Sequence, residues 1–392
     1  MSDSKFPHNK ISRIVRDIPR SGIRDFFDIV NNRKDVVSLG IGEPDFVTPW
    51  RIRDAAYRSL DYGKTSYTSN MGSISLRNAV SKYINSKTKI TYCPKEEVLI
   101  TVGVSEGLDL AIRTFIEPGD EVIYHEPSYV SYNPIIKFAH GIPVVIKTKK
   151  ENNFKITREE LESVKSKKTK LLLLNYPNNP TGSTLTKSDI EMIANFAITN
   201  DIIVVTDEIY SDLSYDDDHF SIISVPGMRE RTIYLHGLSK AWAMTGWRIG
   251  FAAGPKLFIE SMMKIHQYTM LCAPIMCQEA AREALQNGDE ELKRMKNEYL
   301  YRRNYIKSSL KKINIPFIEP KGAFYIFIDI SEFGLSSKDF ALNFLEKKNV
   351  AVVPGTAFGN AGEGFIRCSF ATSLNEIKKA MCKFEEYITS LK

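Results

Sequence analysis

Short apolar runs alternate with amphipathic stretches from residue 98 onward, and this alternation constrains the fold most strongly. The runs are rich in Leu, Ile and Val, and apolar residues at helical spacing fill the intervals between them. Strands that are apolar at nearly every position are typical of a parallel sheet covered by helices on both faces. We expect an α/β fold with a mostly parallel seven-stranded sheet, its strands at Val98–Val102, Glu121–Tyr124, Pro143–Ile146, Lys170–Leu174, Ile202–Thr206, Thr232–Leu235 and Ile249–Ala253.

Helices are expected between these strands and before them. The spacing of apolar residues indicates helices at about Ser21–Val30, Trp50–Leu60, Ile74–Ile84, Ser105–Phe115, Tyr129–Ala139, Arg158–Val164 and Lys187–Thr199. Past Phe251 the pattern changes to a long helix, Asp289–Lys311, followed by mixed short strands and helices. A chain of 392 residues exceeds the size of a single core, so we expect a large domain, 49–284, and a smaller α+β domain formed by 1–48 and 285–392.

Composition narrows the kind of protein. The net charge of +6 is modest, and the basic runs lack interleaved aromatic residues, so no nucleic-acid partner is expected. Five cysteines without CxxC spacing indicate reduced thiols and no zinc site. The polar start and the lack of a long apolar run predict a cytoplasmic protein without a membrane partner.

Unusual residues follow the expected strands. The stretch Gly103–Gly107 opens a helix after the first strand, where free N–H groups attract anions. Further along, Tyr129, Asn179, Asp207 and Tyr210 each stand just past a strand. Ligands of parallel sheets bind at the carboxyl ends of the strands. Each residue alone has an ordinary explanation as a turn, rim or packing residue, and only their convergence points to a site.

A lysine and an arginine complete this set. Lys240 lies among small residues between two apolar runs, and Arg248 follows eight positions later. A desolvated lysine can act as a nucleophile, and an arginine offers paired donors to a phosphate. An aromatic face, an acid, an amide, an anion nest and a lysine suit a planar phosphorylated aldehyde with a pyridine nitrogen, so the residues favour pyridoxal phosphate.

Four motifs carry a family resemblance. They are Ser239-Lys240 followed by Met244–Arg248, then Asn179–Gly182, Gly42–Phe46 and Glu126–Tyr129. The sequence resembles the class I/II aminotransferases, fold type I pyridoxal-phosphate enzymes of the aspartate aminotransferase superfamily. The resemblance extends over nearly the whole chain, in the family's order and spacing.

The resemblance implies roles for the residues that face the cofactor ring. Lys240 would bond the cofactor covalently and move a proton between the substrate α-carbon and the cofactor. Asp207 would keep the pyridine nitrogen protonated, while Asn179 and Tyr210 would bond the phenolate oxygen. Tyr129 matches the position that stacks on the ring.

The resemblance also implies contacts to phosphate, substrate and a second subunit. Phosphate would be held by Val104, Ser105 and Arg248, and Ser239 would also contact the cofactor. Tyr67 matches a tyrosine that reaches the phosphate from the neighbouring subunit, which implies a homodimer. The substrate α-carboxylate would be bound by Gly42, Asn179 and Arg367. Two departures are Gly237, where some members have a phosphate-binding serine, and Cys272, in place of a polar residue near the dimer contact.

The expected activity is transfer of an amino group from an L-amino acid to a 2-oxo acid in amino-acid metabolism. The donor would be aromatic, alanine-like, aspartate or diaminopimelate-type, the acceptor 2-oxoglutarate, and the mechanism ping-pong. A C–S β-lyase on the same fold is the alternative reaction. A regulator's effector domain is disfavoured, because the segment before Gly42 is short for a DNA-binding unit.

Three minor features have competing interpretations. The run Asp216–His219 is expected to be an acidic surface loop rather than a metal site. His236 is expected to pack beside the lysine strand. Phe324 and Tyr325 suit either the substrate mouth or the core of the smaller domain.

Overall fold

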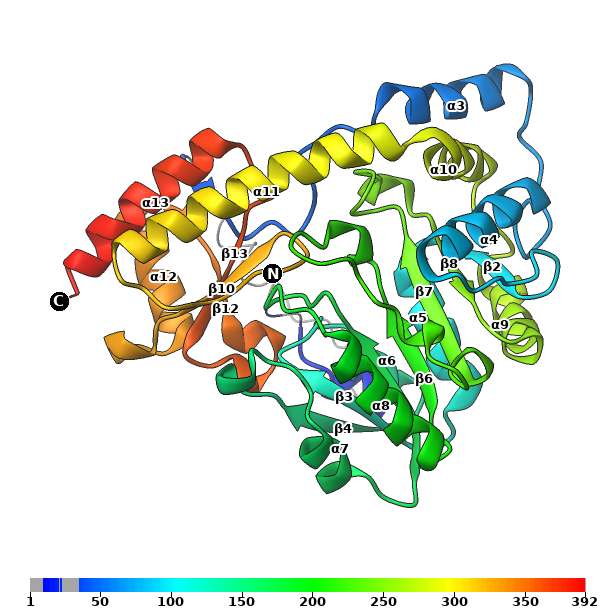
Figure 1. Cartoon of the computed structure of the whole chain (residues 1–392), viewed down its shortest axis with the longest axis horizontal. Coiled ribbons are helices and arrows are strands. Elements are labelled where there is room, and N and C mark those ends of the chain that lie inside the picture. Colours follow the sequence, from blue (N-terminus) through cyan, green and yellow to red (C-terminus); the bar gives the residue numbers. More distant parts are fainter. Residues whose placement is uncertain (1–9, 21, 23–34, 392) are drawn as a thin grey trace.

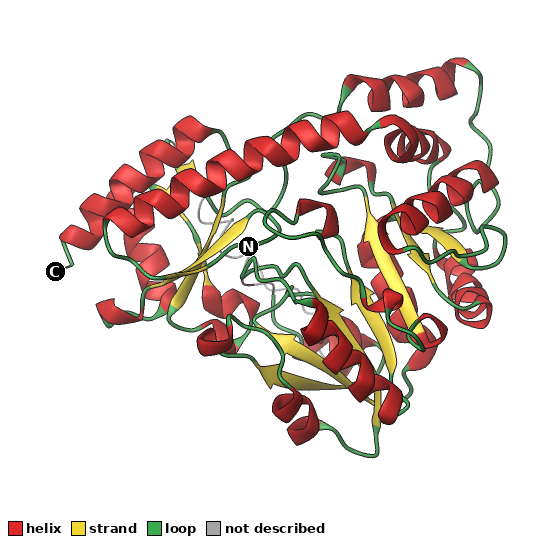
Figure 2. Ribbon diagram, in the orientation of Figure 1, coloured by secondary structure: helices red, strands yellow, loops and turns green. Residues whose placement is uncertain are grey.

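The computed structural model describes residues 10–20, 22 and 35–391. Two sheets lie apart, each with helices packed around it (Figure 2). The expected helix at 21–30 falls outside the described residues except for Gly22.

The larger sheet has seven strands in the order β2-β8-β7-β6-β5-β3-β4. Neighbouring strands are parallel except β8, which runs antiparallel to both β2 and β7. The expected mostly parallel seven-stranded sheet is therefore confirmed. The strands are β2 (Val98–Thr101), β3 (Glu121–Glu126), β4 (Ile142–Lys147), β5 (Thr169–Asn175), β6 (Ile203–Asp207), β7 (Thr232–Gly237) and β8 (Gly250–Ala253).

Both faces of this sheet are buried, which explains the unbroken apolar runs. In β5, Leu171 and Leu173 join one hydrophobic cluster, whereas Leu172 and Leu174 join the other. Because strand side chains alternate between faces, a strand between two helix layers must be apolar at every position.

Helices cover the large sheet in two layers (Figure 1). The cluster of Leu171 includes residues of α5, α6 and α9, and the cluster of Leu172 includes residues of α4 and α8. A capping box at Thr186 and Asp189 begins α8 where the sequence predicts it. Up to residue 287, the α-helices within the described part of the chain are α1 (Arg13–Asp17), α3 (Trp50–Asp61), α4 (Ile74–Thr88), α5 (Gly103–Phe115), α6 (Tyr132–Phe138), α7 (Arg158–Val164), α8 (Lys187–Thr199), α9 (Lys256–Thr269) and α10 (Ile275–Asn287).

The smaller sheet belongs to the C-terminal part of the chain. It has the antiparallel order β12-β13-β10-β9, and β1 pairs with β11 beside it. The four strands of the smaller sheet are β9 (Phe317–Ile318), β10 (Tyr325–Asp329), β12 (Val353–Pro354) and β13 (Phe365–Ser369), and the separate pair is β1 (Val37–Ser38) with β11 (Val350–Ala351). Its helices are α11 (Asp289–Lys312), α12 (Ser337–Lys348) and α13 (Leu374–Thr389).

The division into domains stays a proposal. The boundaries 49–284 and 1–48 with 285–392 keep each sheet within one domain and place β1 with its partner β11. The long helix α11 runs from α10, beside the large sheet, to α13 over the small one (Figure 1).

Candidate active site

A cavity of about 1040 Å³ lies where the large sheet meets the smaller one. Every site residue predicted from the sequence except Tyr67 lines it. Those residues are Gly42, Val104, Ser105, Tyr129, Asn179, Asp207, Tyr210, Ser239, Lys240, Arg248 and Arg367. The carboxyl ends of β5, β6 and β7 thus bring together residues that are far apart in the sequence.

Lys240 follows the end of β7 and points into this cavity. Its Nζ donates to the carbonyl oxygen of Gly42 at 2.7 Å and lies 5.9 Å from the ring centroid of Tyr210. Burial, with the positive charge of Arg367 next in weight, lowers the pKa of the Lys240 ammonium to about 8. A lysine with this pKa is partly deprotonated near neutral pH, as a nucleophile requires.

Asp207 ends β6 and is 5% exposed. Its Oδ2 accepts from the Tyr132 hydroxyl at 2.8 Å and its Oδ1 from the Ile209 N–H at 3.3 Å. Burial raises the pKa of the Asp207 carboxyl to about 6, so it is mostly ionised above that pH. A buried carboxylate that accepts few hydrogen bonds is stabilised by a ligand that donates a further one.

Two residues that hold Asp207 were missed in the sequence. The Tyr132 hydroxyl bonds its carboxylate, and Asn175 Nδ2 donates to its backbone carbonyl at 3.0 Å. Asn175 Oδ1 also accepts from the Asn179 N–H at 3.2 Å. Asn175 is the last residue of β5, so its place at a strand's carboxyl end was a usable signal.

An anion-binding corner forms where α5 begins. Gly103 has φ +77°, and a Cβ there would lie 2.6 Å from Arg248 Nη2. Glycine therefore lets the guanidinium approach the positive end of the helix, next to Val104 and Ser105. A helix N-terminus with an arginine beside it is suited to a phosphate group.

Close packing explains why position 237 is a glycine rather than the serine that some related proteins have. A Cβ at this position would lie 3.0 Å from Val104 Cγ2 and 3.1 Å from the carbonyl oxygen of Ile249. A serine would require Val104 and the backbone at Ile249 and Gly250 to shift by a few tenths of an ångström. The close approach of these elements thus favours glycine.

A second cationic group on the cavity wall is Arg367 of β13, which is 2% exposed. Its Nη1 donates to Asn179 Oδ1 at 3.0 Å and its Nη2 to the Gly40 carbonyl at 2.6 Å. The guanidinium carbon lies 4.4 Å from the ring centroid of Tyr325 and 4.7 Å from that of Phe358. Its Nε has no hydrogen-bond partner among the described residues. The group is fixed in place and retains a free donor.

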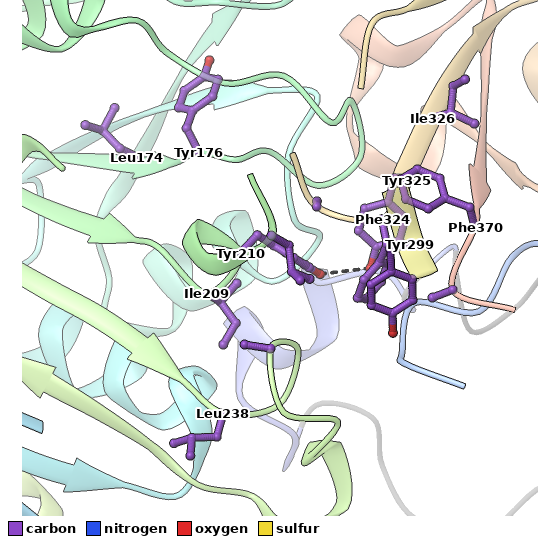
Figure 3. Packing of buried hydrophobic residues seen from close by; sticks show 14 of the residues in the cluster. Leu174, Tyr176, Ile209, Tyr210, Leu238, Tyr299, Phe324, Tyr325, Ile326 and Phe370 are labelled. Carbon is purple, nitrogen blue, oxygen red and sulfur yellow. Dashed lines mark hydrogen bonds between the residues drawn. The ribbon is translucent and has the colours of Figure 1, made fainter. Parts of the chain in front are cut away.

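Tyr325 belongs to the cavity, while Phe324 is fully buried in the core. The hydroxyls of Tyr210 and Tyr325 are 2.9 Å apart, as the dashed line in Figure 3 shows. The Tyr325 hydroxyl also lies 3.3 Å from the Gly42 carbonyl oxygen. Tyr325 thus joins the small sheet to the residues around Lys240.

Comparison with known proteins identifies the family. Residues 34–384 match the family model of aminotransferase class I and II. The chain belongs to this family. The aspartate aminotransferase of Pyrococcus abyssi is 43% identical over 95% of this chain and 96% of its own length.

Solved structures agree with this assignment. The aromatic aminotransferase of Pyrococcus horikoshii superposes with a TM-score of 0.89 at 40% identity, over 94% of this chain and 99% of that one. The aspartate aminotransferase of Thermus thermophilus with maleate gives 0.91 at 35% identity, over 96% and 99%. The expected fold type I architecture is confirmed, and the chain is an aminotransferase.

Tyr67 is the predicted site residue that stands apart in this aminotransferase. Its side chain is 82% exposed and does not line the cavity. A role in the site of the same chain is therefore not visible, whereas a role across a subunit contact stays a prediction.

The acidic run at 216–219 is engaged in ion pairs. Asp216 pairs with Arg303, Asp217 with Lys321, and His219 with Glu208. Among the residues that the structure describes, no cluster of His, Cys, Asp and Glu could hold a metal ion. In that same part of the chain, no helix has the length and apolar character needed to cross a membrane.

Proposed function

We propose that this aminotransferase uses pyridoxal phosphate to move an amino group from an L-amino acid to a 2-oxo acid, with 2-oxoglutarate as acceptor. The two substrates would bind in turn, in a ping-pong mechanism. The observation that carries the proposal is a lysine of lowered pKa in one cavity with two separate anion sites and a buried carboxylate.

The residues present fit the cofactor. The α5 corner with Arg248 suits its phosphate, and Tyr129, which packs edge-on against Tyr132, offers an aromatic wall for its ring. Asp207, buried and mostly ionised above pH 6, suits a protonated pyridine nitrogen. Pyridoxal phosphate, when bound, supplies an aldehyde that bonds amines and a ring that takes up electrons released at the substrate α-carbon.

The chain's own groups then have defined tasks. Lys240 Nζ, with a pKa near 8, would take the proton from the substrate α-carbon and pass it to the cofactor, with the reverse transfer when the oxo acid is aminated. Tyr210 and Asn179 orient the phenolic side of the cofactor. Ser239 adds a contact at its phosphate.

Arg367 is the proposed binding site for the substrate α-carboxylate. In the structure Asn179 Oδ1 and the Gly40 carbonyl occupy its Nη donors, while Nε is free. A carboxylate accepts two donors from arginine in parallel and would compete well for them. Gly42, whose carbonyl accepts from Lys240, borders the same space.

The lining of the cavity bears on the class of amino donor. Tyr129, Tyr325 and Ile41 offer apolar surface, which suits aromatic or alanine-like donors. The relatives named above act, by their names, on aspartate and on aromatic substrates, so we retain aspartate-type donors in the proposal. Diaminopimelate-type donors are retained from the sequence resemblance alone.

The test is a visible spectrum of the purified holoenzyme during titration with single amino acids and no acceptor. We expect the band of the lysine-bound cofactor to bleach with certain donors and to return when 2-oxoglutarate is added. Persistence of the band while cysteine-type substrates yield pyruvate and ammonia would establish the β-lyase alternative instead.

A homodimer is part of the proposal. Large apolar side chains are exposed near α3, the loop that carries Tyr67, and the end of α9, which lie on one side of the molecule (Figure 1). They include Val47, Trp50, Tyr62, Tyr67, Tyr268 and Met270, with Val47 72% and Tyr268 86% exposed. A second copy would cover this surface and bring Tyr67 to the partner's phosphate corner.

Hybrid dimers test this arrangement. A Lys240→Ala chain mixed with a Tyr67→Ala chain should regain activity, because one of the two sites then has both residues. Two inactive parents that stay inactive after subunit exchange, verified by mass, would contradict it. A cytosolic location stays a prediction, supported by the five free cysteines.

A further inference from the structure

A buried polar cluster lies behind the site and joins three elements. The Tyr83 hydroxyl of α4 is 2.6 Å from Asp212 Oδ2 and 2.7 Å from His236 Nε2. His236 Nε2 is 3.2 Å from the same carboxylate oxygen. His236 is fully buried, and Asp212 and Tyr83 are each 7% exposed. His236 is packed beside the lysine segment as expected, and it also takes part in this hydrogen-bonded cluster.

The positions of these residues connect the cluster to the site. Asp212 lies in a short 3-10 helix, Ser211–Leu213, which directly follows Tyr210. His236 is the next-to-last residue of β7, four positions before Lys240. The hydrogen bonds between Asp212 and His236 therefore tie the segment that carries Tyr210 to the segment that carries Lys240.

The imidazole has little freedom to move. Its ring stacks on Tyr83 at 5.3 Å between centroids and meets Phe251 edge-on at 5.6 Å. Packing on two sides holds Nε2 toward Asp212, and Nδ1 has no hydrogen-bond partner among the described residues. A rigid hydrogen-bonded group of this kind couples the position of the Tyr210 segment to that of the Lys240 segment.

Charged groups connect the cluster to the protein surface. The Lys87 ammonium lies 2.8 Å from Asp212 Oδ1, and its side chain is half exposed. Although burial opposes it, the hydrogen bond and charge of His236 and the charge of Lys87 hold the pKa of Asp212 below its usual range. Burial is the largest cause of the raised pKa of Asp207, and His236 is among the groups that lower it. The described ionisable groups around His236 include Asp207, Asp212, Tyr83, Tyr234 and, beyond Asp212, Lys87 and Lys296.

We propose that His236, held by Asp212 and Tyr83, is a positioning residue that fixes Lys240 and Tyr210 relative to Asp207. The proposal rests on the proposed function, because it concerns the same site. Loss of the cluster leaves the chain folded and changes how these groups titrate. His236 itself touches neither substrate nor cofactor.

The experiment compares Asp212→Asn, His236→Asn and Tyr83→Phe with a matched control, Tyr92→Phe. Tyr92 is also a buried tyrosine, but its hydroxyl has no hydrogen-bond partner among the described residues. In the holoenzyme we measure kcat, KM and the pH at which the absorption of the lysine-bound cofactor changes. Asp212→Asn and His236→Asn should lower kcat about tenfold at little changed KM and shift the spectral midpoint by about half a pH unit or more. Tyr83→Phe should have a smaller effect and Tyr92→Phe none.

A second measurement does not depend on transamination. In the carbon-13 labelled apoenzyme, the carboxyl titration of Asp207, assigned by its loss in Asp207→Asn, should move to higher pH in His236→Asn. Variants that lose thermal stability but keep the kcat, the spectral midpoint and the Asp207 titration of the wild type would overturn the proposal. A wild-type enzyme that does not transaminate would refute the proposed function, while the Asp207 titration would still report on the cluster.

Discussion

Ionisation of the buried Asp207 carboxyl lowers the free energy of unfolding. The substitution Asp207→Asn removes this charge and should reveal the size of the cost. Burial raises the pKa of its carboxyl from the usual 3.8 to about 6. A shift of about 2 units corresponds to about 3 kcal/mol. Because the folded-state pKa is the higher one, the cost is absent below about pH 4, grows as the pH rises, and is complete above about pH 6.

Asparagine removes the charge and keeps the shape. It retains one oxygen for the Tyr132 hydroxyl or the Ile209 N–H, so the loss of one hydrogen bond costs about 1 kcal/mol at every pH. The apoenzyme of Asp207→Asn should therefore be about 2 kcal/mol more stable than the wild type above pH 6. Below about pH 4 it should be about 1 kcal/mol less stable. The kcat of the holoenzyme should fall at least about a hundredfold.

Urea unfolding of both apoenzymes between about pH 2.5 and pH 8 measures this difference. Asp329→Asn is the control with the opposite sign. Burial alone would raise the pKa of Asp329, but hydrogen bonds from Ser331 and the ion pair with Lys150 lower it. The control should lose stability near neutral pH and lose less as the pH falls through the folded-state pKa. A stability difference for Asp207→Asn that does not grow with pH would refute the reasoning.

Three further outcomes follow from the geometry. Arg367→Gln should raise the KM for amino-acid donors about a hundredfold, measured by steady-state kinetics, and should raise the apoenzyme pKa of Lys240 because a nearby positive charge is lost. Gly103→Ala should weaken cofactor binding at least about tenfold in a spectroscopic titration, since its Cβ would meet the Arg248 guanidinium at 2.6 Å. The rate at which apoenzyme takes up pyridoxal phosphate should rise with pH and level off above about pH 8, because the neutral Lys240 amine reacts. A rate that is flat from pH 6 to pH 9 would contradict the last outcome.

The parallel sheet could be predicted because the apolar run of each strand is visible in a short stretch of sequence. A strand buried on both faces needs apolar residues throughout, and Leu171–Leu174 shows this without any knowledge of its neighbours. The acid that follows such a strand, Asp207, stands out for the same reason. The roles of the site residues came from the family resemblance and stay proposals.

The partners of these residues could not be predicted, because they come from distant elements. Nothing near Tyr132 in the sequence shows that its hydroxyl reaches Asp207, 75 residues later. The Tyr210–Tyr325 contact joins residues 115 positions apart. The helix expected from Tyr129 begins only at Tyr132, since apolar spacing does not reveal where a turn ends and a helix begins. Tertiary hydrogen bonds, such as those of His236, leave no periodic signal.

The central claim is that Lys240, in this cavity, bonds the cofactor. Reduction of the holoenzyme with sodium borohydride, followed by proteolysis and peptide mass spectrometry, tests it most directly. We expect one pyridoxyl-phosphate group per chain, on the peptide that contains Lys240, and none in Lys240→Ala. An unmodified Lys240 peptide, or a stoichiometric adduct on another lysine, would show that Lys240 does not bond the cofactor.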